Sequence, residues 1–141
     1  MCMAQAVIWA IIAGVFTALE SSINSQLGRQ LSPSIATLHN LATGTVLMLT
    51  VSAVRGSLTR YLKVFSVSPI WLIGGLFGAM IIYLSSRAIP VLGVSKTLTL
   101  ILSAQILAGM AIDACFGSMT LDGYKICGVV FLLLGANLII R

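Results

Sequence analysis

The sequence predicts an all-α integral membrane protein with five transmembrane helices per chain, in a single transmembrane domain covering residues 1–141. Of the 141 residues, 59% are hydrophobic and 8% are charged, whereas soluble domains carry about 25% charged residues. The apolar residues form long continuous runs, while a transmembrane barrel would need alternating strands of about ten residues. Composition and pattern therefore both favour membrane-spanning helices.

Five apolar segments are long enough to cross a hydrocarbon core of about 30 Å. We expect them at Ala4–Leu27, Ser34–Val54, Pro69–Ser86, Val94–Cys115 and Gly123–Ile140.

The connections between these segments carry the turn residues. Pro33 lies near the start of the second helix, where proline is favoured. The loop Arg55–Ser68 is basic and is expected to contain a short helix at the membrane interface. The links Arg87–Gly93 and Phe116–Asp122 complete the chain.

The basic residues give no preferred orientation. The formal net charge is +5, but the eight Lys and Arg residues are spread over several loops, so they indicate lipid headgroups rather than nucleic acid as the partner. With five spans, four basic residues fall on each side of the membrane: Arg29, Arg87, Lys96 and Arg141 against Arg55, Arg60, Lys63 and Lys125. Orientation normally follows a Lys and Arg excess on the cytoplasmic side. Either one loop decides insertion, or the chain inserts both ways and pairs antiparallel, forming an inverted repeat from two copies.

Glu20 is an ionisable residue inside the first expected helix. It lies about 12 Å from the end marked by Gly28. A carboxylate at that depth costs several kcal/mol on insertion scales, about 2.5–3.5 for Asp. Gly14, Thr17 and Ser21 form a neighbouring stripe that we attribute to helix packing. Because packing does not require an ionisable group, we expect Glu20 to bind substrate or protons.

Four other polar residues are candidates for the same substrate or proton site: Asn24, His39, Asn40 and Gln105. Asn24 follows Glu20 by about one turn, and His39 lies at a depth similar to that of Glu20. His39 and Glu20 could therefore meet in the bundle and share a proton or a hydrogen bond. The alternative for His39 is a hydrogen-bonded packing residue. Gln105 lies in the middle of the fourth helix, where a polar group needs a partner. Asp113 is expected to be a hydrated charge near a helix end.

Glycines on the third and fifth helices predict close helix packing or dimerisation. They are Gly74, Gly75, Gly78, Gly128 and Gly135. No phosphate-binding loop, metal-ligand pair or nucleophile–base set is present in the sequence, so we expect no enzyme activity, no cofactor and no metal site. Cys2, Cys115 and Cys127 are expected to be free thiols.

The order and spacing of these motifs resemble the YdcZ family of bacterial inner-membrane proteins, within the drug/metabolite transporter superfamily. The resemblance covers nearly the whole chain. In the first helix it depends on seven residues, Gly14, Leu19, Glu20, Ile23, Asn24, Leu27 and Gly28. It continues through Trp71–Ala79, Pro90–Gly93, the Gln105, Asp113 and Gly117 spacing, and the Gly128 and Gly135 pair. This sequence departs from the family pattern at Glu20, often Gln in the family, and at His39 and Asn40.

The resemblance implies a five-helix unit that pairs with a second copy or a homologue. It also implies kinship with small multidrug resistance exporters, which exchange protons for cations through first-helix glutamates of an antiparallel dimer. We therefore expect an alternating-access exporter of a small cation or metabolite, coupled to protons through Glu20 and working as a homodimer or heterodimer. The alternatives are a passive dual-topology channel and a non-transporting membrane subunit that assists a partner.

Overall fold

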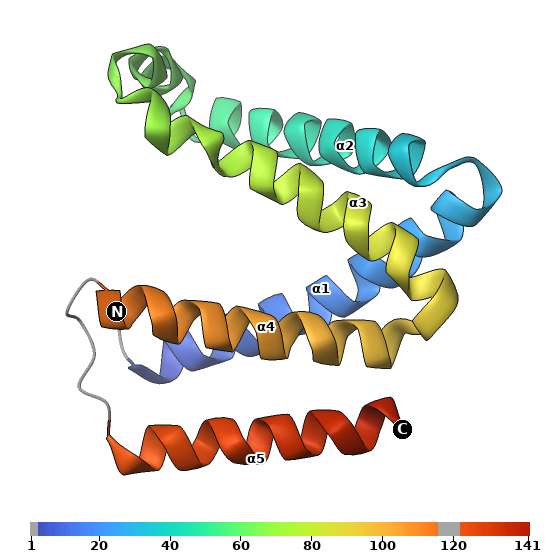
Figure 1. Cartoon of the computed structure of the whole chain (residues 1–141). Coiled ribbons are helices and arrows are strands. Elements are labelled where there is room, and N and C mark those ends of the chain that lie inside the picture. Colours follow the sequence, from blue (N-terminus) through green and yellow to red (C-terminus); the bar gives the residue numbers. More distant parts are fainter. Residues whose placement is uncertain (1–2, 116–121) are drawn as a thin grey trace. The chain divides into compact units, whose positions relative to one another are not determined.

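A computed structural model describes residues 3–115 and 122–141, and every regular element in them is a helix (Figure 1). Within these two ranges, five helices are long and apolar enough to cross a membrane, which confirms the predicted all-helical architecture. Cys2, Gly117 and most of the expected link before the fifth helix lie outside the described residues. The chain forms two compact units, Met1–Pro90 and Val91–Arg141.

The first unit begins with α1 (Met3–Gln30) and α2 (Pro33–Val54). Ser32 caps α2, because its backbone is extended and its Oγ accepts a hydrogen bond from the Ile35 amide at 3.2 Å. Pro33 occupies the first turn, where a missing amide hydrogen has no cost. The two helices meet at this turn and diverge away from it (Figure 1).

The first helix continues three residues beyond its expected end at Leu27. Gly28 lies inside the helix, where α1 passes close to the start of α2. A Cβ at position 28 would lie 3.5 Å from Pro33 Cα and 3.8 Å from Ala36 Cβ. The glycine that the sequence suggested as a helix end is therefore a site of close approach between α1 and α2.

The basic loop after α2 contains two short 3-10 helices, η1 (Leu58–Ser66) and η2 (Pro69–Ile73). The expected interfacial helix is thus present as η1. The third span continues from η2 into α3 (Gly74–Leu92).

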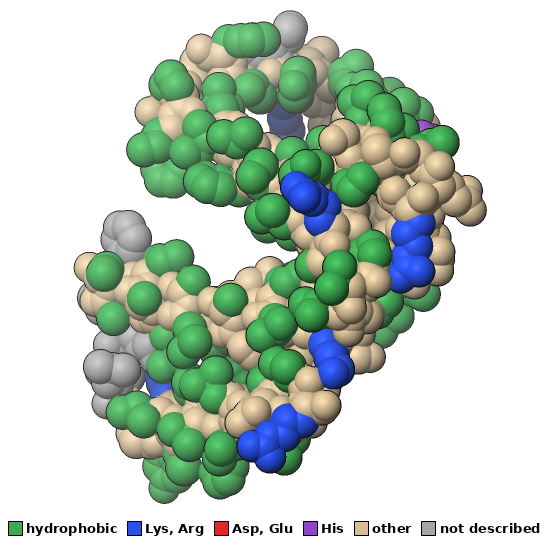
Figure 2. All heavy atoms as spheres, turned by 45° about the vertical axis from the view of Figure 1, so that its right-hand side comes forward, with side chains coloured by type: hydrophobic (Ala, Val, Ile, Leu, Met, Phe, Trp, Pro, Cys, Tyr) green, Lys and Arg blue, Asp and Glu red, His purple; other side chains and the backbone are tan. Residues whose placement is uncertain are grey.

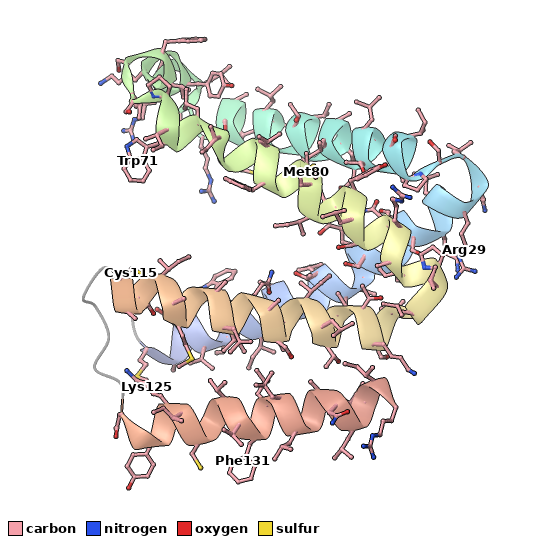
Figure 3. The ribbon with its side chains drawn as sticks, in the orientation of Figure 1. Arg29, Trp71, Met80, Cys115, Lys125 and Phe131 are labelled. Carbon is pink, nitrogen blue, oxygen red and sulfur yellow. The ribbon has the colours of Figure 1, made fainter. Side chains whose placement is uncertain are left out.

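The prediction of a link at Arg87–Gly93 is wrong, because α3 continues through Pro90 to Leu92. Pro90 lies in the last turn, where proline removes a single backbone hydrogen bond instead of breaking a long helix. The helix ends at Gly93, whose φ of +86° is the left-handed conformation that terminates helices. The Arg29 guanidinium donates to the Pro90 carbonyl at 3.4 Å, from the end of α1 labelled in Figure 3. This bond places a cation at the carboxyl end of α3.

The second unit is an antiparallel pair, α4 (Val94–Cys115) and α5 (Gly123–Ile140), which lie side by side in Figure 1. These limits are the ones expected for the fourth and fifth helices. The Lys96 ammonium donates to the Ile140 carbonyl at 2.7 Å and so fixes the end of α5 to the start of α4. Phe131 points away from α4 (Figure 3).

Few described side chains are buried in the single chain. The buried hydrophobic residues are Ala36, Ile89 and Ala136, whereas large apolar residues are exposed along every span. The space-filling view shows the same excess of hydrophobic side chains (Figure 2). A surface of this kind suits a lipid environment, where apolar side chains have no water to avoid.

Candidate functional site

The centre of the candidate site is a hydrogen bond between the first two helices. Asn40 Nδ2 donates to Glu20 Oε1. Glu20 is ten residues before Gln30, so it lies about 15 Å inside the end of α1, deeper than the sequence predicted. Asn40 lies about 10 Å into α2 from Pro33. Asn40 therefore holds the Glu20 carboxylate in place.

This carboxylate stays accessible although it lies within a candidate span. Glu20 is exposed in the single chain and Asn40 is half-buried. The arrangement combines a carboxylate held by a neutral donor with exposure in the single chain. Chemically it can accept a proton or bind a cation.

His39 does not take the place expected for it. The structure brings Asn40 to Glu20, and the described residues include no hydrogen bond between His39 and Glu20. Successive residues of a helix point about 100° apart, so His39 and Asn40 face different directions. A role for His39 in the site stays a prediction. His39 is exposed on another face of α2, in a shallow surface groove with Ala42, Thr43 and Val46.

Asn24 lies one turn beyond Glu20 on α1, with 7% of its surface exposed. Ala36 and Thr37, near the start of α2, are also buried. The part of α1 around Asn24 is thus packed, whereas Gly14 and Thr17, nearer the start of the helix, are exposed. Thr17 donates its hydroxyl to the Ala13 carbonyl of its own helix at 2.9 Å, so this hydroxyl bonds within α1.

Gln105 belongs to the second unit, where it is exposed on α4. Its share in a common site with Glu20 stays a prediction. Asp113 is exposed two residues before the end of α4, which suits the expected hydrated charge.

The five packing glycines have open space around them. At Gly74, Gly75, Gly78, Gly128 and Gly135, an added Cβ would meet no atom within 4 Å. No contact among the described residues of either unit explains these glycines. Their expected role in helix packing or dimerisation therefore stays a prediction.

Sequence reasoning missed a groove of about 800 Å³ between α2 and η1. It begins at Asn40 and ends at Arg60 and Tyr61. The signal that could have found it is the alternation of apolar and basic residues in Leu58–Ser66, a pattern that favours a helix lying at the membrane interface.

Cys115 and Cys127 are exposed free thiols. Within residues 3–115 and 122–141, no three His, Cys, Asp or Glu side chains are grouped as metal ligands would be.

Comparison with known protein families finds a match over most of the chain. The family model described as "Putative inner membrane exporter, YdcZ" matches residues 5–138, from the first span through the fifth. Comparisons with curated proteins and with solved structures gave no match. The family match confirms the resemblance seen in the sequence and the expected inner-membrane location. This chain therefore belongs to the YdcZ family of inner-membrane proteins.

Proposed function

We propose that the protein is a secondary exporter in which a proton and a cationic substrate compete for Glu20. The exporter description of the family supports the class of function. The observation that carries the proposal is the Glu20 carboxylate, held by Asn40 within a membrane span yet exposed to approach. Intramembrane acids of this kind commonly belong to proton relays and substrate pathways.

Competition for one carboxylate provides the coupling. A proton neutralises Glu20, and a cation is then no longer attracted to it. Arrival of the cation at the ionised carboxylate requires the proton to have left. If the site opens to only one side of the membrane at a time, each proton that enters allows one substrate to leave.

We further propose that two copies pair antiparallel. The four-to-four balance of basic residues supports insertion in both orientations. Two oppositely inserted copies would make an inverted repeat, the arrangement on which alternating access depends in many larger transporters. The exposed apolar surface of the single chain suits either a partner chain or lipid.

The test measures flux in liposomes that contain the purified full-length protein. A pH gradient is imposed, and uptake of a panel of small organic cations and proton movement are recorded together. We expect gradient-driven uptake by the wild type, loss of it in Glu20→Gln, and retention in Asp113→Asn. Asp113 is the matched control, because it is an exposed acid near a helix end.

The same experiment separates the alternatives. If Glu20→Gln still carried cations down their own concentration gradient, without proton movement, the protein would be a passive channel. This result would contradict the proposal. The absence of flux for every cation, with folded protein in both orientations, would favour a subunit that assists a partner.

A further inference from the structure

The groove between α2 and η1 runs along α2, which is a candidate membrane span. Its α2 wall extends from Asn40 to Ser52, which spans about 18 Å of helix. Three residues at the start of η1, Leu58, Arg60 and Tyr61, complete the lining. The volume of about 800 Å³ falls in the range of about 300–1,000 Å³ typical of small-molecule sites.

The body of the groove is apolar. Leu41, Met48 and Leu49 line it from α2, and Leu58 lines it from η1. Gly44 also lines it, and an added Cβ there would meet no atom within 4 Å. The space beside position 44 is therefore open to a chain-like ligand.

The interfacial end of the groove is cationic. Arg60 and Tyr61 line it and supply hydrogen-bond donors. Residues 55–66 contain three basic side chains, Arg55, Arg60 and Lys63, and no acid. This end therefore attracts an anion and repels a cation. An apolar groove with cationic side chains at one end is complementary to an anionic amphiphile.

We propose that this groove binds one anionic phospholipid, with its phosphate at Arg60 and an acyl chain lying along α2 past Gly44. The depth of the groove matches this orientation, since η1 follows the end of a membrane span and Asn40 lies inside it. The proposal goes beyond transport at Glu20 and does not depend on it. The lipid would also connect η1 to the α2 wall that carries Asn40.

Native mass spectrometry of the full-length protein tests the proposal. The probes are phosphatidylglycerol and phosphatidylcholine with identical acyl chains, and glycerol phosphate as the headgroup without a chain. We expect preferential binding of phosphatidylglycerol and no competition by glycerol phosphate. Arg60→Gln should weaken phosphatidylglycerol binding about tenfold, since a charge-assisted bond is lost. Arg55→Gln is the matched control, because Arg55 is an exposed arginine that does not line the groove.

A second pair of variants tests the acyl-chain position. Gly44→Leu should fill the groove and reduce binding of phosphatidylglycerol by a similar factor, whereas Gly109→Leu, on α4, should not. Equal losses in Arg55→Gln and Arg60→Gln would indicate diffuse surface attraction and overturn the proposal. Competition by glycerol phosphate would indicate a free phosphate site instead. Unchanged binding in Gly44→Leu would show that no acyl chain passes position 44 and would overturn the proposal.

Discussion

Asn40 holds the carboxylate of Glu20 across the contact between α1 and α2. The two residues are 20 positions apart, on opposite sides of the Ser32 turn. This bond assigns Asn40 a positioning role beside the acid, and the following prediction separates that role from general stability.

We expect Asn40→Leu to lower proton-coupled uptake about tenfold, because the carboxylate loses the donor that orients it. Asn40→Asp should move the pH of half-maximal uptake upward, because two carboxylates at hydrogen-bond distance retain one proton between them. Flux in liposomes over a range of pH measures both effects. His39→Leu is the matched control, since His39 is the preceding residue and faces elsewhere. Equal effects of Asn40→Leu and His39→Leu would contradict the positioning role.

The close approach at Gly28 predicts a size limit on one face of α1. An added Cβ would be in ordinary contact with Pro33 and Ala36, so Gly28→Ala should fold. Gly28→Leu should overpack the contact and destabilise the protein by about 1–3 kcal/mol. Thermal unfolding in detergent measures the change. Gly14→Leu, on the same helix but with nothing within 4 Å, should change the midpoint little. A similar shift in both variants would refute the assigned contact.

The bond from Lys96 to the Ile140 carbonyl predicts that a positively charged side chain at position 96 stabilises the second unit. Lys96→Met keeps most of the apolar stem but removes the donor at the end of α5. We expect a loss of about 1 kcal/mol of stability, the usual value for a hydrogen bond or a helix-terminal charge. Lys96→Arg should retain part of this stability, because arginine keeps the charge and a donor. Comparison of the unfolding midpoints of the two variants measures the effect, and identical midpoints would argue against a role for the charge.

Much of the fold follows from the sequence because the length of an apolar segment is fixed by the bilayer. The limits of α4 and α5 could be predicted from the apolar segments alone. The ends of α1 and α3 were harder, because Gly28 and Pro90 are breakers in an isolated helix. In the folded unit, Gly28 is used for close approach and Pro90 falls in a last turn that Arg29 caps.

The site was only partly predictable for a geometric reason. The cost of an intramembrane charge identified Glu20 without a structure. The choice between His39 and Asn40 depends on how α2 is rotated relative to α1, and adjacent positions differ by about 100°. Hydrophobic pattern fixes that rotation poorly here, because the polar residues of α2, among them Thr37, His39 and Thr45, are spread around the helix.

The open space around Gly78 predicts an effect on assembly and not on the fold of the chain. If the Gly74 and Gly78 pair packs against a second copy, Gly78→Leu should reduce dimer formation and leave the helix content unchanged. Energy transfer between labelled chains in liposomes measures dimerisation. Gly109→Leu, on α4 outside this pair, is the control. Full dimerisation of Gly78→Leu would remove this face from the proposed interface.

The balance of basic residues predicts insertion in both orientations. A single cysteine at Thr59, an exposed position of η1, would report the side on which the basic loop lies. In a variant that lacks the native cysteines, we expect Thr59→Cys to react with impermeant reagents from both sides of the membrane at similar yield. Adding one Lys to this loop, by Ser57→Lys, should bias the label toward the cytoplasmic side, because one charge breaks the tie. Labelling from one side only, before any charge is added, would exclude the antiparallel homodimer. The transport unit would then require an oppositely oriented homologue.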